Sequence, residues 1–119
     1  MSTTNQCEQD RRLRELALPF LGKWVPFILI LLARQSHSFA DLERAIDGIS
    51  RKVLNENLVQ LQMSGLILKN GQPSTGFPVS YELTELGKSS LVVLESLKTW
   101  LKAHETEINF NRQAFGSTE

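Results

Sequence analysis

The chain has 119 residues, 41% of them hydrophobic, which is typical of one globular domain. Thirteen basic and thirteen acidic residues cancel, so no overall field draws the chain to nucleic acid. The single cysteine excludes an intrachain disulfide and agrees with a reducing cytoplasm. The apolar run from Val25 to Ala33 is interrupted by Pro26 and is far shorter than the ~20 residues of a membrane helix. The polar N-terminus lacks a signal-peptide core, so we expect a cytoplasmic protein that contacts no membrane.

Residues 1–9 are polar, and we expect them to form a flexible segment ahead of a single domain over residues 10–107. The apolar spacing that follows predicts a first helix from about Asp10. Because Pro19 cannot donate to the helical ladder and disfavours the α region at Leu18, we expect this helix to end or kink near Leu18.

A second helix is predicted after the junction Gly22-Lys23-Trp24. Pro26 suits its first turn, where a missing N–H costs little, and the helix should extend to about Arg34. It is apolar nearly all round, which predicts the central buried element of the fold. Residues 35–37 form a loop in this interpretation, with room for a short strand that pairs with the hairpin described below.

Residues 38–65 have the layout of a short helix, a turn and a longer helix. Ser38 and Ser50 are good N-caps for the two helices, and Asp47-Gly48 is a turn dipeptide between them. Gly65 is placed to end the second helix in the left-handed conformation. The leucines of the second helix recur at helical spacing and predict one buried face; they are Leu54, Leu58 and Leu61.

Two β-like runs follow, at residues 66–69 and 78–84, and the turn-forming residues 70–76 separate them. A hairpin directly behind a helix-turn-helix is a wing, here residues 66–84. The predicted fold class is therefore mainly α with a small β-hairpin (α+β), a winged helix-turn-helix.

A long final helix is predicted from Glu85 to about Glu107, with Thr84 as its cap. Its apolar residues exceed one stripe, and the first helix shows a similar surplus, which usually marks an oligomer interface. We therefore expect a homodimer held by N- and C-terminal helices. The expected interface residues are Leu13, Leu16, Phe20, Val93, Leu94, Leu97, Trp100 and Leu101. The tail, residues 108–119, carries little pattern, and we expect it to lie over the partner or to be disordered.

Opposite its leucines, the 50–65 helix carries cationic and amide side chains at its N-terminal end, which suit a DNA major groove. Asn55 has the geometry to pair with adenine, and Arg51 with guanine or a phosphate. The simpler alternative is a solvated helix face. The candidate DNA-binding residues of the helices and the wing are Ser38, Ser50, Arg51, Lys52, Asn55, Glu56, Lys69, Gln72, Ser74 and Thr75.

Several motifs share one order and spacing with a known family. They are Gly22-Lys23-Trp24, Phe39-x-x-Leu42, Gly48-Ile49-Ser50-x-Lys52-x-Leu54, Leu58-x-x-Leu61-x-x-x-Gly65-Leu66 and Tyr81-x-Leu83-Thr84-x-x-Gly87. From about Gly22 to Trp100 the chain resembles the HxlR-type winged helix-turn-helix regulators. The resemblance implies a dimeric bacterial transcription regulator with an architecture related to MarR-type proteins.

Some members of that family sense electrophiles, oxidants or aldehydes through an N-terminal cysteine, which makes Cys7 a candidate sensor. Cys7 lies about one helical turn further upstream than the family's usual cysteine, and the alternative is an ordinary thiol in a flexible tail. Val59 and Gln62 also depart from the family pattern, in which Arg and Glu are usual. Residues 70–78 hold no cation, so wing contacts to DNA should be neutral and phosphate neutralisation modest.

The sequence thus predicts a repressor that binds double-stranded DNA at a palindromic operator as a homodimer, with an oxidant or small-molecule effector. The alternative is a winged-helix protein-interaction module that binds no DNA. We expect no enzyme, because the chain has no nucleophile–base arrangement and no glycine-rich phosphate loop. His37 and His104 lack acidic or thiol partners at metal-ligand spacing, so no metal or cofactor is expected.

Overall fold

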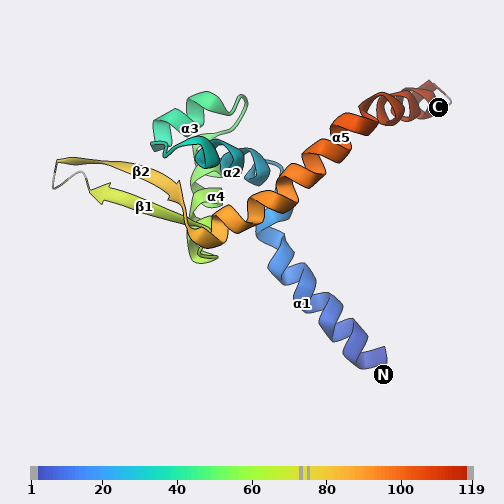
Figure 1. Ribbon diagram of the computed structural model, residues 1–119, viewed down its shortest axis with the longest axis horizontal. Helices are drawn as coiled ribbons and strands as arrows, with labels where there is room; N and C mark the ends of the chain where they lie inside the picture. The colour runs from blue at the N-terminus through green and yellow to red at the C-terminus, as the bar shows by residue number, and fades with distance from the viewer. Residues whose placement is uncertain (1–2, 73, 75, 118–119) are drawn as a thin grey trace. The chain divides into compact units, whose positions relative to one another are not determined.

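The computed structural model describes residues 3–72, 74 and 76–117. These residues form helices and one two-stranded sheet, in the order α1 (Thr3–Leu21), α2 (Val25–Arg34), α3 (Phe39–Ala45), α4 (Arg51–Met63), β1 (Ile67–Gln72), β2 (Phe77–Leu83) and α5 (Glu85–Ser117) (Figure 1). Contacts within the chain divide it into two units, Met1–Ser89 and Ser90–Glu119. The predicted fold class, a mainly helical winged helix-turn-helix, is confirmed.

The core of the first unit lies among α2, α3, α4 and the base of the hairpin. Its fully buried side chains are Ile28, Leu29, Leu42, Leu54, Leu58, Leu61 and Ile67. The predicted leucine face of α4 is therefore confirmed. The prediction that α2 supplies a central buried element agrees with the burial of Val25, Ile28, Leu29 and Leu32, while Phe27 of the same helix remains 56% exposed.

Both helices of the helix-turn-helix begin at the predicted serine caps. At α3, Asp41 N donates to Ser38 Oγ at 3.0 Å, and Ser38 N donates back to the Asp41 carboxylate at 3.5 Å, which forms a capping box. At α4, Val53 N donates to Ser50 Oγ at 3.1 Å. These caps satisfy amide groups that the first turn of a helix leaves without partners, so they define where each helix starts.

The hairpin lies within the predicted wing, residues 66–84, but its first strand is longer than predicted. β1 and β2 are antiparallel, and Ile67 lies opposite Leu83 near the helices. β1 ends at Gln72, and β2 begins at Phe77. Asn70-Gly71 was interpreted as the start of the turn, but Gly71 has φ of 83° and the pairing register shifts around it. A glycine with positive φ accommodates a β-bulge, so the strand continues past it.

The residues before α3 join the sheet through a single bridge. His37 N donates to Tyr81 O at 3.1 Å, and Tyr81 N donates to His37 O at 2.8 Å. The short pairing segment expected at residues 35–37 is thus present. It fixes the hairpin to the entrance of the helix-turn-helix.

The first helix differs from its predicted bounds at both ends. It begins at Thr3 instead of Asp10. Side chains one turn apart contact each other in its first turns, as in the 3.1 Å hydrogen bond from the Gln6 amide to the Asp10 carboxylate. It also continues through Pro19 to Leu21. The expectation that Pro19 would end the helix near Leu18 was therefore wrong.

The last helix extends to Ser117 instead of ending near residue 107. The expected tail therefore belongs to α5 as far as Ser117, although residues 108–117 carry few apolar residues. Helix formation needs no apolar stripe when the residues have adequate helix propensity and continue an existing helix, because elongation is easier than nucleation. Among the described residues no helix is long and apolar enough to cross a membrane.

Thr84 forms the joint between the helix-turn-helix and α5. Its hydroxyl donates to Gly65 O at 2.6 Å and accepts from Gly87 N at 3.0 Å, which confirms the predicted cap. At Gly87 the first turn of α5 lies so close to Leu66, the residue before β1, that a Cβ atom would lie 2.1 Å from Leu66 O. Only glycine fits this approach without a shift of the backbone.

Candidate nucleic-acid interface

The α4 helix presents one buried face and one exposed face. Arg51, Lys52, Asn55 and Glu56 are all exposed at its N-terminal half, while the leucines on the opposite side are 0% exposed. The periodicity of the sequence dictates this division, because residues one turn apart share a face. The exposed side chains supply two cations, one amide and one carboxylate, which are the groups that bind phosphates and base edges.

Arg51 is held from the side by α3. Its guanidinium carbon lies 5.3 Å from the centroid of the Phe39 ring, and its Nη1 lies 3.9 Å from Glu43 Oε1. The guanidinium nevertheless stays accessible, since the side chain is 76% exposed. The two contacts restrain the direction in which the charge points without removing it from solvent.

Sequence reasoning did not assign Phe39 or Glu43 to the site. In the sequence Phe39 was named only as part of the motif Phe39-x-x-Leu42, and Glu43 was given no role. Their roles depend on how the Asp47-Gly48 turn folds α3 against α4. The dipeptide predicted the turn, and Gly48 has the positive φ, 88°, that such a turn uses. The dipeptide does not indicate which side chains the turn brings together.

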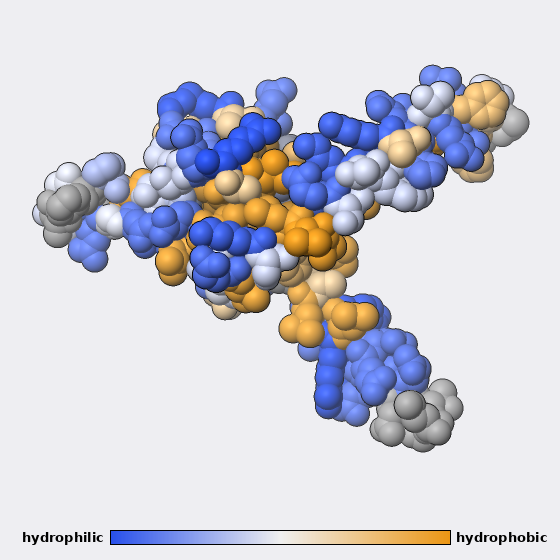
Figure 2. Space-filling view, in the orientation of Figure 1, coloured by the Kyte–Doolittle hydropathy of each residue, from blue (hydrophilic) through white to orange (hydrophobic). Residues whose placement is uncertain are grey.

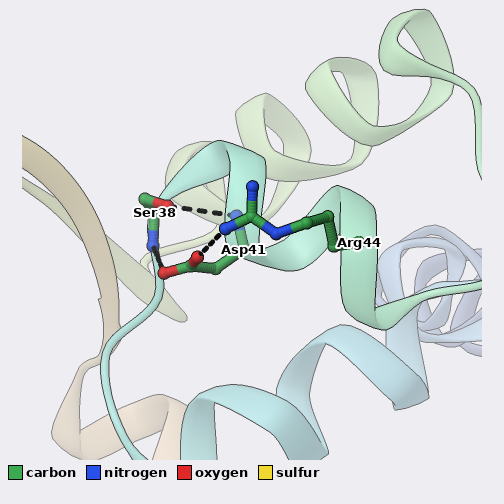
Figure 3. A network of polar contacts seen from close by, with 3 residues as sticks. All are labelled: Ser38, Asp41 and Arg44. Carbon is green, nitrogen blue, oxygen red and sulfur yellow. Dashed lines mark hydrogen bonds and ion pairs between the residues drawn. The ribbon is translucent and has the colours of Figure 1, made fainter.

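Arg44 takes part in the capping network at the start of α3 (Figure 3). Arg44 Nη2 donates to the Asp41 carboxylate that also closes the capping box on Ser38. Hydrogen bonds from Ser38, first from its side chain and then from its backbone, together with the charge of Arg44, hold the pKa of Asp41 below its ordinary value. Arg44 is therefore paired with a carboxylate of its own helix, which reduces the charge that it could offer to a phosphate.

The two serines predicted to contact DNA act as caps. Ser38 is half-buried and Ser50 is exposed, and each hydroxyl accepts from a backbone amide of its own helix. Each hydroxyl is thus engaged by its own helix, and the role of either serine in binding DNA stays a prediction. Ser50 directly precedes Arg51, so its cap also fixes where the candidate DNA-binding face begins.

The wing carries the other candidates. Lys69, Gln72 and Ser74 are exposed, with Lys69 opposite Tyr81 in the sheet. Thr75 lies outside the described residues. Lys69 therefore supplies the positive charge of the hairpin at its helix-proximal half.

Apolar side chains remain exposed on both terminal helices. On α1, Leu13 is 66% and Leu16 72% exposed, Phe20 is half-buried, and apolar surface gathers over the half of the helix nearer Leu21 (Figure 2). On α5 the exposed residues are Val93 (69%), Leu97 (50%), Trp100 (52%) and Leu101 (45%). Leu94, also expected at the interface, is only 8% exposed in the single chain and so offers a partner less surface than its neighbours.

Cys7 is exposed on α1, inside the helix and not in a flexible tail. Arg11 is the cation one turn after Cys7, and its Nη2 lies 3.9 Å from Glu8 Oε1. Arg12 also contacts Glu8, at 3.3 Å. The thiol thus stands on an accessible helix face among charges of both signs. Among the described residues no group of three His, Cys, Asp or Glu side chains is placed to hold a metal ion.

A helix-turn-helix with an exposed polar N-terminal face on its second helix, followed by a two-stranded wing, defines the winged-helix class of regulators. Residues 20–109 match the model of the HxlR-like helix-turn-helix family. The chain belongs to this family of DNA-binding transcriptional regulators.

Relatives agree with this assignment. The HTH-type transcriptional regulator YvaP of Bacillus subtilis is 33% identical over 97 residues, which cover 81% of this chain and 89% of that protein. The HTH-type transcriptional regulator YodB of Bacillus subtilis is 31% identical over 87 residues, covering 72% of this chain and 78% of YodB. The solved structure of the transcriptional regulator ytfH from Salmonella typhimurium has a TM-score of 0.75 and 28% identity, and the match covers 84% of this chain and 89% of that chain.

Proposed function

We propose that this regulator acts as a homodimeric repressor, with α4 of each copy in the major groove of a palindromic operator. The observation that carries the proposal is the exposed N-terminal half of α4, where Arg51, Lys52 and Asn55 stand opposite a fully buried leucine face. A helix of 13 residues with this division is long enough to enter a groove and is held firmly from behind. The site of action in this proposal is the cytoplasm, where the DNA of a bacterium or archaeon lies.

The test is a binding titration with the intergenic DNA beside the protein's own gene, followed by fluorescence anisotropy. The logarithm of the wild-type binding constant should fall linearly with the logarithm of the salt concentration, with a slope of about 0.9 per neutralised phosphate. Arg51→Ala and Asn55→Ala should each cost on the order of 1–3 kcal/mol and relax sequence choice at the base that each contacts.

Arg112→Ala is the matched control, since Arg112 is an exposed cation on α5, outside the candidate interface. If both α4 variants bound the intergenic DNA as tightly and selectively as wild type, the groove assignment would be wrong. A monomer that binds no DNA at low salt would instead support a protein-interaction role.

The homodimer is proposed from the exposed apolar residues of α1 and α5. A protein that leaves leucine and tryptophan side chains about half exposed on a helix generally covers them with a partner. A twofold axis would repeat α4 at a spacing of about one or two turns of DNA. Footprinting should therefore show two protected half-sites related by a palindrome.

We also propose that Cys7 mediates a response to oxidants. YodB has been solved in a diamide-treated and in a reduced form. In this chain Cys7 is exposed, and because it is the single cysteine, a disulfide must join two copies. Diamide should yield a Cys7–Cys7′ link detected by mass spectrometry, together with a changed operator affinity. A Cys7→Ser protein that responds to diamide as wild type does would eliminate the thiol from the response.

A further inference from the structure

A pocket lies between α2 and the helix-turn-helix, on a part of the first unit that neither the groove-facing residues nor the apolar residues of α1 and α5 occupy. Its volume is about 300 Å³. One wall comes from α2 and its N-cap, and the other from the end of α3; the apolar lining residues are Trp24, Phe27, Ile30, Leu31, Ala45 and Ile46. The Trp24 ring also lies against the turn, since a Cβ atom at Gly48 would lie 3.6 Å from its Cη2 atom.

The size of the pocket suits a small molecule. An apolar cavity of about 150 Å³, engineered in another protein, is large enough to bind benzene. The present volume therefore has room for one ring and a polar substituent, and it falls at the lower end of the range of about 300–1,000 Å³ for small-molecule sites. The open aromatic surface agrees, because Phe27 is 56% exposed and Trp24 is half-buried.

Two opposite charges complete the lining. Arg34, at the end of α2, and Asp47, in the turn after α3, both border the pocket and are exposed. Within the described part of the chain, neither side chain takes part in an ion pair or a side-chain hydrogen bond. The guanidinium supplies donors and the carboxylate supplies acceptors, and their charges cancel. A ligand with a neutral polar end that both accepts and donates therefore complements them better than an anion or a cation.

We propose that this pocket is a binding site for a small, uncharged aromatic molecule. Its ring lies among Trp24, Phe27 and Ile30, and its polar end accepts a hydrogen bond from Arg34 and donates one to Asp47. The apolar side chain of a second copy is the competing occupant, but it would leave both charged groups without partners. The site does not depend on how α4 binds DNA, so its test needs no operator.

The test is an NMR titration of the full chain with benzamide, whose amide both donates and accepts. The chain has two tryptophans, so the indole N–H of Trp24 reports on the pocket, while that of Trp100 on α5 serves as an internal control. Benzamide should shift the Trp24 signal and the amides of residues 45–47 saturably in the millimolar range, and should leave Trp100 unchanged. Benzoate and benzylammonium should bind several-fold more weakly.

Two variants and a control test the residues. Ala45→Leu should abolish the Trp24 shift by filling the pocket, and it leaves no cavity that would destabilise the fold. Arg34→Gln should weaken benzamide about tenfold, as expected for loss of a hydrogen bond to a charged group. Arg44→Gln is the matched control, since Arg44 neighbours Ala45 but does not line the pocket, and it should bind like wild type.

Three results would overturn the proposal. The first is no saturable Trp24 shift up to the solubility limit of benzamide. The second is an equal shift of both tryptophans, which would indicate nonspecific contact with aromatic surface. The third is a Trp24 signal that moves with protein concentration and not with benzamide, which would identify the pocket as a contact between copies.

Discussion

Arg51 owes its orientation to two residues of the preceding helix. The Phe39 ring lies beneath the guanidinium, and Glu43 approaches it at 3.9 Å, while the side chain remains largely exposed. Such contacts are weak in energy, because exposed ion pairs contribute only about 0.2–1 kcal/mol. In the proposed contact of Arg51 with DNA, their effect would be to reduce the number of directions in which its charge can point.

The first prediction concerns this restraint. Glu43→Gln should lower discrimination at the base read by Arg51 by about two- to fivefold, because the guanidinium is no longer held to one side. Overall DNA affinity should rise slightly at low salt, because a carboxylate near the phosphates has been removed. Competition titrations with operator variants measure both quantities.

A double-mutant cycle gives the control for Glu43. In an Arg51→Ala background, Glu43→Gln should no longer alter base discrimination, whereas its effect on affinity should persist. An undiminished loss of discrimination in that background would show that Glu43 acts through another residue. Glu85→Gln, on exposed Glu85 of α5, should change neither quantity.

The second prediction at this scale concerns Gly87. An added methyl group would lie 2.1 Å from the Leu66 carbonyl oxygen, so Gly87→Ala must displace backbone. The free energy of unfolding should fall by roughly 1–3 kcal/mol, the usual cost of overpacking. Urea denaturation measures the change. Gly116→Ala is the control on the same helix, since nothing lies within 4 Å of an added Cβ there, and it should be neutral or slightly stabilising.

The sequence predicted single residues well where local chemistry decides their role. Ser38, Ser50 and Thr84 cap helices because a hydroxyl before a helical pattern has one dominant use. The close approach at Gly87 and the contact of Glu43 with Arg51 could not be predicted. Both depend on the tertiary position of a second segment, which residue type and spacing do not encode.

At the scale of the element, α3 is the shortest helix among the described residues, and its capping box determines where the helix begins. Ser38, Asp41 and Arg44 connect its first and last turns within seven residues. Short helices are marginal without tertiary packing or caps. Position and stability of α3 are therefore sensitive to the ionisation of Asp41.

The third prediction is a pH dependence from this network. Because the pKa of Asp41 is lowered in the folded chain, its contribution to stability is present above the ordinary value of 3.8 and is lost as the pH falls through the lowered pKa. Wild type should have a higher Tm than Asp41→Asn near neutral pH, and the two should converge in acid. Thermal unfolding followed by circular dichroism at several pH values measures the difference.

Ser38→Ala tests the cause of that pH dependence. It removes the hydroxyl that contributes most to the lowered pKa, so the pH-dependent part of the Tm difference between Asp and Asn at position 41 should shrink. It should also cost about 0.5–2 kcal/mol at neutral pH as a lost N-cap. A Tm difference between wild type and Asp41→Asn that stays constant into acid would contradict the role given to Asp41.

Element boundaries were predicted best where a cap or a buried face marks them. The start of α4 and its leucine face agree with the structure, because an N-cap and a strict helical spacing coincide. The start of α1 and the end of α5 were placed too far inward, because polar helical turns carry no apolar period to detect. The end of α1 was placed too early because Pro19 was expected to stop the helix. The strand through Gly71 was missed for a similar reason, since a bulge uses the same residues as a turn.

At the scale of the molecule, the exposed apolar residues of α5 are the main unexplained surface of the single chain. They are Val93, Leu97, Trp100 and Leu101, which are 45–71% exposed along with their neighbour Val92. Burial of such side chains at a twofold interface yields about 25 cal/mol per Å² of apolar surface removed from water. The proposed dimer would use this surface.

The fourth prediction tests the dimer. Leu97→Glu should yield a monomer in sedimentation experiments, because a carboxylate would be buried in an apolar interface. Operator affinity should fall by about 100-fold or more, since two half-sites no longer bind as one unit. The Tm measured at low protein concentration should change little, as Leu97 is 50% exposed in the single chain.

Lys102→Glu is the matched control, because Lys102 is an exposed polar residue of the same helix and the same side chain, glutamate, is introduced there. It should remain dimeric. A Leu97→Glu protein that sediments as a dimer would place the interface elsewhere. The sequence predicted that such a surface exists, but not that Leu94 within it is already covered, because burial within the chain cannot be read from a helical wheel.

The joint at Thr84 has a mechanical consequence. Its hydroxyl is bonded to Gly65 just beyond α4 and to the first turn of α5, and the backbone at Gly87 leaves no space for sliding against Leu66. A rotation imposed on the beginning of α5 must therefore turn the end of α4 with it, because no slack linker absorbs the motion. The joint would then transmit a rotation of α5 to α4 as torque, and so toward DNA bound by α4 as proposed, without any contact being broken.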